Sequence, residues 1–214
     1  MPKPRVLLAD DHRLVLEGFR RILEGQYELV GAVEDGRALL DSAEKLQPDI
    51  AIIDLSMPLL NGIDAATQLK KICPDTKIII VTMHADTEYV RSAFEAGASA
   101  YVLKRSAVDE LEQAMQAVMA GRSYITPLVT REVLDVFLST TADTLTRTRT
   151  LTTRQREVLQ LLAEGRTAKE IGATLNISSR TVEFHKSQVL TQLNLQTTAD
   201  LVKYALTHGI VQID

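Results

Sequence analysis

The first part of the chain alternates short apolar runs with amphipathic stretches. The runs occupy residues 6–10, 27–33, 49–54, 77–82 and 100–104. Most are almost continuously apolar, which is typical of strands buried on both faces of a parallel sheet. After each run, apolar residues recur at helical spacing, over residues 14–23, 37–46, 64–72, 87–96 and 107–120. This alternation predicts a doubly wound α/β domain with a five-stranded parallel sheet, spanning residues 1–121.

The second part of the chain is helical in pattern. Apolar periodicity predicts four helices, at about 153–164, 168–175, 179–193 and 197–208, which form a separate all-α domain over residues 151–214. Residues 122–150 are predicted to be a linker, with one possible helix around Arg131–Leu138. Eight of the sixteen residues in 138–153 are threonine, and such a sequence does not build a core. A threonine-rich β-hairpin is the alternative, although the segment lacks turn signals.

Composition narrows the class of protein. The 214 residues are 45% hydrophobic, enough for ordinary cores, and no apolar run is long enough to span a membrane. With the single cysteine, Cys73, and no signal peptide, we expect a cytoplasmic protein. Cys73 itself is more simply a small helix residue than a redox thiol. Residues 1–121 carry a net charge of −6 and residues 122–214 one of +2, which favours a nucleic-acid partner for the second part alone.

Polar side chains follow the apolar runs of the predicted sheet. Asp10 and Asp11 end the first run, Asp54 the third, Thr82 the fourth and Lys104 the fifth. Because the carboxyl ends of parallel strands meet at one edge, we expect these five side chains to lie together. Three carboxylates in one place repel one another unless a cation relieves the repulsion.

Magnesium is the cation that these residue types favour, because it prefers oxygen ligands and retains several waters. Asp11 and Asp54 are the best candidate ligands, Asp10 acts through water, and the backbone carbonyl of Ser56 supplies a neutral ligand. Asp54, which ends a central strand, is the predicted nucleophile toward phosphorus. Phosphoryl transfer then requires neutralised phosphoryl oxygens, for which Lys104 and Thr82 are available.

The four histidines are given smaller roles. His12, His185 and His208 share no metal-ligand spacing, so no transition-metal site is predicted. His84 lies two residues after Thr82 and is interpreted as a solvated loop histidine that screens the site. A general base for dephosphorylation is the alternative.

Residues 6–122 resemble the receiver domain of response regulators, which has a flavodoxin-like fold. The resemblance rests on LLADDH, on IIDLSMPLLNG (52–62), on VTMHAD (81–86) and on GASAYVLK (97–104). It implies that a sensor histidine kinase phosphorylates Asp54 and that Thr82 and Tyr101 are switch residues. An aspartyl-phosphate phosphatase is a rival interpretation. Such enzymes usually place a second Asp two residues after the nucleophile, where this chain has Ser56.

In the third helix of the all-α domain, Val182, Val189, Leu190 and Leu193 share one face, and Arg180, Phe184, Ser187, Gln188 and Thr191 share the other. A short helix, a turn at 176–178 and then this helix form a helix-turn-helix pattern. The predicted DNA-contacting residues are Lys169, Thr181, Val182, Glu183, Phe184, His185, Lys186, Ser187 and Gln188. Of these, Lys169, Thr181, His185 and Lys186 are assigned to phosphates, and Glu183, Phe184, Ser187 and Gln188 to bases. Packing under a neighbouring side chain is the alternative for Phe184.

The segment resembles the LuxR-type helix-turn-helix in Leu151-Thr152, in Arg156-Glu157-Val158-Leu159, in Lys169-Glu170-Ile171 and in Thr181-Val182-Glu183 with His185. A receiver followed by this domain resembles the NarL/FixJ class of response regulators. The resemblance implies a transcription regulator that dimerises when phosphorylated and binds inverted half-sites in promoter DNA, with RNA polymerase a further candidate partner. It implies no enzyme activity beyond the protein's own phosphorylation and dephosphorylation.

One departure from the family pattern concerns affinity. Residues 192–198, where the family often has basic side chains, carry no positive charge. We therefore expect weak DNA binding by the monomer.

The helix at 197–208 is either a dimer seam, through Leu201, Val202, Ala205 and Leu206, or a core element. A DNA-binding protein controlled by a ligand or by a protein docked on the receiver is a second rival.

Overall fold

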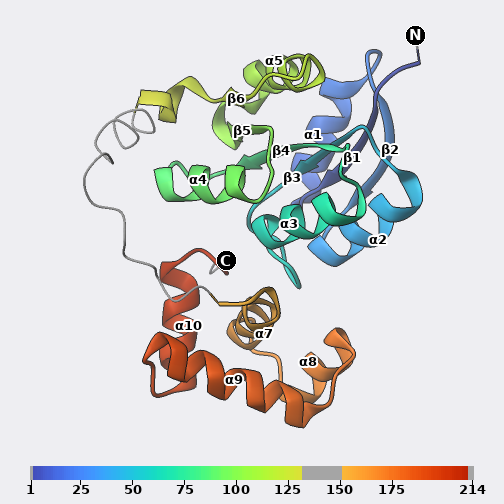
Figure 1. Cartoon of the computed structure of the whole chain (residues 1–214). Coiled ribbons are helices and arrows are strands. Elements are labelled where there is room, and N and C mark those ends of the chain that lie inside the picture. Colours follow the sequence, from blue (N-terminus) through green and yellow to red (C-terminus); the bar gives the residue numbers. More distant parts are fainter. Residues whose placement is uncertain (1, 132–150, 212–214) are drawn as a thin grey trace. The chain divides into compact units, whose positions relative to one another are not determined.

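The computed structural model describes residues 2–131 and 151–211, which form an N-terminal α/β unit and a C-terminal helical unit (Figure 1). The predictions for residues 132–150, including most of the threonine-rich segment, lie outside the described residues. No helix among those described is long and apolar enough to cross a membrane.

The α/β unit is built on a parallel sheet whose strand order is β2-β1-β3-β4-β5-β6. β1, β3, β4 and β5 are almost entirely buried, which explains why their sequences are continuously apolar. The strands are β1 (Arg5–Ala9), β2 (Glu28–Val33), β3 (Ile50–Ile53), β4 (Lys77–Thr82), β5 (Ala100–Leu103) and β6 (Tyr124–Ile125).

Five helices cover the two faces of this sheet. α1 (Arg13–Leu23) and α5 (Ala107–Met119) pack on one face, where Phe19 and Leu111 join a core with residues of β1, β3, β4 and β5. Figure 1 shows α2 (Gly36–Leu46), α3 (Gly62–Ile72) and α4 (Thr87–Glu95) on the other face. A 3-10 turn, η1 (Lys104–Ser106), joins β5 to α5. The predicted doubly wound α/β fold is confirmed.

The sheet has one strand more than the sequence predicted. β6 pairs with β5 through Ala100–Tyr124 and Tyr101–Ile125, so the sheet continues past residue 121. Residues 127–131 are helical, and Val129 is buried. A strand of two residues has no measurable alternation of its own, and its place is set by the free edge of β5.

The C-terminal unit consists of α7 (Thr153–Ala163), α8 (Ala168–Leu175), α9 (Ser179–Leu193) and α10 (Thr198–Thr207). The four predicted helices are therefore confirmed to within one residue at each end. Thr152, Thr167 and Thr197 each close a capping box with the residue three positions later, and Ser178 caps α9. These local caps explain why the boundaries are legible in the sequence.

The core of this unit also bears on the role of α10. Leu201 and Ala205 are fully buried beside Val158 and Ile171, so this half of the proposed seam is core. Val202 and Leu206 are only half-buried.

Two glycines in helices of the α/β unit provide a matched stability test. A Cβ at Gly62 would overlap the carbonyl of Asp54 and lie 2.9 Å from the Cα of Leu55, whereas a Cβ at Gly18 would meet nothing within 4 Å. We expect Gly62→Ala to lower the free energy of unfolding by about 1–3 kcal/mol. Gly18→Ala should raise it by about 0.5–1 kcal/mol, because alanine loses less backbone entropy in a helix. Urea unfolding monitored by circular dichroism measures both changes. Equal effects of the two substitutions would contradict this packing.

Candidate functional site

Two carboxylates meet at the carboxyl edge of the sheet because β1 and β3 are neighbours. Asp10 directly follows β1 and Asp54 directly follows β3, and the backbone N–H of Asp54 donates to the carbonyl of Ala9 at 2.9 Å. Both side chains are buried, with 2% of Asp10 and 3% of Asp54 exposed. Two buried acids this close require a counter-charge.

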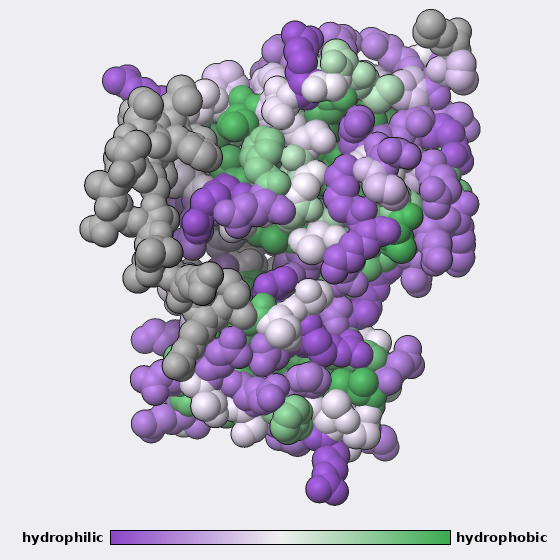
Figure 2. Space-filling view, in the orientation of Figure 1, coloured by the Kyte–Doolittle hydropathy of each residue, from purple (hydrophilic) through white to green (hydrophobic). Residues whose placement is uncertain are grey.

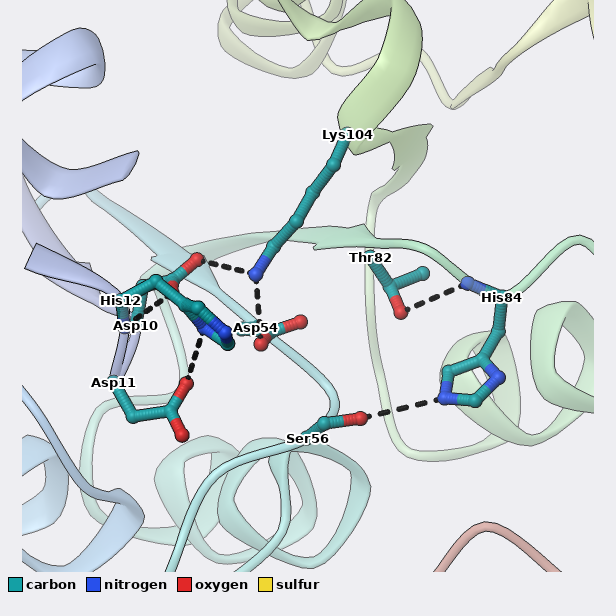
Figure 3. A network of polar contacts seen from close by, with 8 residues as sticks. All are labelled: Asp10, Asp11, His12, Asp54, Ser56, Thr82, His84 and Lys104. Atoms are coloured by element: carbon teal, nitrogen blue, oxygen red, sulfur yellow. Dashed lines mark hydrogen bonds and ion pairs between the residues drawn. The ribbon is translucent and has the colours of Figure 1, made fainter. Parts of the chain in front are cut away.

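Lys104 provides that counter-charge from two strands away. It follows β5, and its Nζ lies 2.9 Å from Asp54 Oδ2 and 2.8 Å from Asp10 Oδ2 (Figure 3). The lysine side chain is itself only 11% exposed. The structure therefore brings Asp10, Asp54 and Lys104 together at one edge of the sheet, as the sequence predicted.

For both Asp54 and Lys104, burial and the neighbouring opposite charge act on the pKa in opposite directions. Burial raises the pKa of Asp54, and Lys104 only partly offsets this. Burial also acts to lower the pKa of Lys104, but Asp54 and Asp10 outweigh it, so that pKa is raised. The ammonium therefore stays charged at neutral pH, and Asp54 favours any partner that adds positive charge beside it.

Asp11 and His12 extend the cluster toward solvent. His12 Nδ1 lies 2.7 Å from Asp11 Oδ1 and 3.2 Å from Asp10 Oδ1. One ligand atom from each of Asp10, Asp11, His12 and Asp54 lies within 4.8 Å of the others. The sequence spacing of His12 predicted no metal role, yet the fold places its ring beside the three carboxylates. Their oxygens are the donors that a hard cation such as Mg²⁺ prefers.

Thr82 and His84 form a second set of contacts beside Asp54. The Thr82 side chain is fully buried, and its hydroxyl accepts from the backbone N–H of His84 at 3.2 Å. Ser56 Oγ lies 3.3 Å from His84 Nε2, and the backbone N–H of Ser56 donates to the Asp54 carboxylate. In this structure the Thr82 hydroxyl is thus engaged by the loop after β4. The suggested use of the Ser56 carbonyl as a metal ligand stays a prediction.

The surroundings of His84 correct one expectation, which concerns its exposure, while the switch role of Tyr101 stays a prediction. Tyr101 is fully buried, and its hydroxyl donates to the carbonyl of His84 at 3.0 Å. The His84 ring is half-buried and lies 4.4 Å from the ring of Tyr89, so the interpretation of His84 as a solvated loop residue is wrong. Burial lowers the pKa of His84 despite the nearby charge of Asp54. The sequence showed only its distance from Thr82 and gave no sign of these contacts.

In the helical unit, the outer face of α9 carries most of the predicted contact residues. Glu183, Phe184, Ser187 and Gln188 are exposed, and Phe184 is 58% exposed rather than packed under a neighbour. Thr181, His185 and Lys186 are half-buried on α9, and Lys169 is exposed on α8. The surface of the helical unit in the view of Figure 2 is mainly hydrophilic or neutral.

Val182 does not belong with these contact residues. Its side chain is fully buried in the core of the helical unit together with Val189 and Ile171. Its inclusion in the predicted DNA-contacting set is wrong, because a side chain that solvent does not reach has no surface to offer to DNA. The run of consecutive residues from 181 to 188 necessarily turns through the inner face of the helix.

Comparison with known proteins covers both units. The response regulator receiver domain family matches residues 6–116, and the family of bacterial regulatory proteins called luxR matches residues 149–205. The transcriptional regulatory protein MctR of Rhizobium johnstonii is 35% identical over 98% of this chain and 96% of its own. The oxygen regulatory protein NreC of Staphylococcus carnosus is 37% identical over 94% of this chain and 96% of its own.

One of the similar solved structures is a complex with DNA. RcsB of Salmonella enterica serovar Typhimurium, bound to promoter P1flhDC in the presence of the phosphomimetic BeF3-, is 29% identical. The match covers 95% of this chain and 98% of that one, with a TM-score of 0.60.

The raised pKa of Asp54 gives the fold a specific pH dependence. Because the folded protein holds this proton more tightly than the unfolded chain, protonation of Asp54 contributes its full stability at pH values below its ordinary pKa. That contribution is lost as pH rises through the raised pKa. In metal-free buffer, Asp54→Asn should therefore gain stability relative to wild type between acidic and neutral pH. Urea unfolding at a series of pH values measures the difference, and Asp41→Asn, which removes an exposed carboxyl from α2, is the control. A difference that does not change with pH would contradict the assignment.

Proposed function

Because the chain belongs to the LuxR family of two-component response regulators, which regulate transcription, we propose that phosphorylation of Asp54 controls its binding to DNA through α9. The observation that carries the proposal is the position of Lys104, whose ammonium contacts both Asp54 and Asp10 at the edge of the sheet. A buried carboxylate beside a fixed positive charge supports this role, because phosphoryl transfer to a carboxylate needs neutralisation of the phosphoryl oxygens.

The phosphoryl donor is a phosphohistidine of a sensor histidine kinase. A carboxylate oxygen of Asp54 attacks phosphorus, the P–N bond breaks, and its electron pair leaves with the imidazole nitrogen. Lys104 already donates to Asp54 Oδ2 and is within reach of the incoming phosphoryl oxygens. Burial of Asp54 keeps bulk water from the acyl phosphate.

A divalent cation fits the same edge. Asp10, Asp11 and Asp54, together with the Ser56 carbonyl, would hold Mg²⁺, which supplies neutralisation of the phosphoryl oxygens. The donor set consists of hard oxygen atoms, and burial raises the pKa of Asp54 by more than Lys104 lowers it. His12 lies next to these ligands, with its Nδ1 2.7 Å from Asp11 Oδ1.

His84 connects this site to the switch residues. The Thr82 hydroxyl accepts from the N–H of His84, and Tyr101 donates to the carbonyl of the same residue. When the Thr82 hydroxyl turns to donate to the phosphoryl group, it releases the His84 backbone. That release alters the loop before α4 and the packing of Tyr101. Two arrangements of this loop then constitute the two states whose balance phosphorylation shifts.

DNA contact follows from the outer face of α9. Glu183, Phe184, Ser187 and Gln188 are assigned to base edges, and Lys169, Thr181, His185 and Lys186 to phosphates. The promoter-bound structure of RcsB supports binding by the equivalent domain here. Since residues 192–198 add no positive charge, the phosphorylated protein binds as a dimer to reach useful affinity.

Phosphorylation is tested by mixing the full chain with Mg²⁺ and acetyl phosphate. Intact mass spectrometry should show an adduct of about 80 Da on wild type and none on Asp54→Asn, since phosphorylation adds a phosphoryl group to one side chain. The treated wild type should also bind DNA more tightly than the treated variant. An adduct on Asp54→Asn, or no adduct on wild type, would contradict the assignment.

The phosphate contacts are tested through salt dependence. Lys186→Gln should weaken binding to all duplex sequences alike and reduce the slope of log K against log salt by about 1, because one phosphate contact is lost. Lys203→Gln, which removes an exposed lysine from α10, is the control and should change neither quantity. Fluorescence anisotropy over a range of salt concentrations measures both. A slope that Lys186→Gln leaves unaltered would remove Lys186 from the phosphate-contacting set.

A further inference from the structure

Gln155, in the first turn of α7, is a buried amide whose hydrogen-bonding groups are all in use. Only 5% of the residue is exposed. Its Oε1 accepts from the backbone N–H of Thr152 at 2.8 Å and completes the capping box of α7. Its Nε2 donates to Gln192 Oε1 at 3.1 Å and to Gln188 Oε1 at 3.5 Å. An amide nitrogen carries two N–H donors, which matches the two glutamine oxygens of α9 that Nε2 contacts.

These contacts open onto a hollow on the outer face of α9. The hollow has a volume of about 480 Å³ and is lined by Gln155, Phe184, Ser187, Gln188, Thr191 and Gln192. Of these lining residues, Gln155 alone comes from α7, and it is the most deeply buried. Phe184, Ser187 and Gln188 are the same side chains that face the base edges in the proposed function. Gln155 therefore lies behind the DNA-contacting surface without being part of it.

The direction of the hydrogen bonds determines what Gln188 presents to DNA. With its Oε1 turned toward Gln155, Gln188 directs its amide nitrogen outward, as a donor. The base edges that accept in the major groove are N7 and O6 of guanine, N7 of adenine and O4 of thymine, whereas cytosine offers only a donor, its N4 amine. A glutamine free to turn over would present its oxygen equally well.

We propose that Gln155 is a positioning residue that sets the hydrogen-bonding polarity of Gln188 and thereby selects the base that Gln188 reads. The inference rests on the proposed DNA-binding function. Gln155, which caps α7, would then contribute to base specificity through the side chain of Gln188 on α9. Gln188 prefers a base that offers an acceptor, which is guanine, adenine or thymine, and disfavours cytosine.

Gln155→Glu separates this role from helix capping. The carboxylate still accepts from the N–H of Thr152, so the capping box is retained, but it has no donor for Gln188 or Gln192. Gln188 must then turn its nitrogen inward to the carboxylate and its oxygen outward. The base preference at that position should reverse toward cytosine, with a change of about tenfold in the ratio of affinities.

The experiment uses the full chain and a pool of random-sequence duplex DNA. Selection with wild type defines the bound sequence, and the base pair whose preference Gln188→Ala abolishes is the one that Gln188 reads. Affinities for the four bases at that pair are then measured for wild type, Gln155→Glu and Gln188→Glu. Gln188→Glu presents only acceptors, so it should shift the preference in the same direction as Gln155→Glu. The double variant Gln155→Glu with Gln188→Ala should show no preference at that pair.

Stability and specificity are read separately. Thermal unfolding reports whether Gln155→Glu preserves the helical unit, and Gln155→Met, which keeps the volume without donors or acceptors, should relax the preference without reversing it. Equal loss of affinity for all four bases in the Gln155 variants overturns the inference and leaves a capping role alone. If wild type selects no sequence from the pool, the proposed function fails instead.

Discussion

The N-terminal unit depends on one ammonium group between two buried carboxylates. Asp10 and Asp54 are adjacent because β1 and β3 are adjacent, and burial at the strand ends removes the water that would otherwise screen them. Lys104 reaches them from the far side of β4 and contacts both. The order of the parallel strands therefore brings two repelling carboxylates together and also brings the ammonium group that neutralises them. Burial nevertheless raises the pKa of Asp54 despite Lys104, so a further positive charge would stabilise its ionised form.

His84 plays a comparable connecting role beside the same strands. Its backbone N–H contacts Thr82, its carbonyl contacts Tyr101 and its ring contacts Ser56. This one loop residue therefore contacts Ser56, two positions after Asp54, and both proposed switch residues. In the helical unit, Gln155 lies in a similar position, behind the α9 side chains that are proposed to contact DNA. In both units the proposed role of such a residue is to hold the orientation of the side chains assigned to ligand contact.

Much of this was predictable from sequence, because it depends on periodicity and topology. Buried parallel strands give continuous apolar runs, so the residue that follows each run, such as Asp54 or Lys104, falls on a known edge. The boundaries of the four C-terminal helices could be predicted because threonine and serine caps mark where each helix begins. The two-residue strand β6 was missed because its place depends on the edge of β5.

Side-chain contacts between distant residues were out of reach. The burial of His84 depends on Tyr89 and Ser56, and the role of Gln155 depends on how α7 crosses α9, neither of which leaves a sequence pattern. Val182 was placed among the DNA contacts because a family motif was carried over as a continuous run, although helical periodicity by itself put the residue in the core.

The most direct test is a crystal structure of the full chain with Mg²⁺ and beryllofluoride, which together imitate the phosphorylated aspartate. We expect an arrangement in which the Lys104 ammonium contacts the group carried by Asp54, the metal lies on Asp11 and Asp54, and the Thr82 hydroxyl has left the N–H of His84. A structure in which Lys104 turns to solvent, or in which Asp11 points away from the metal, would contradict it.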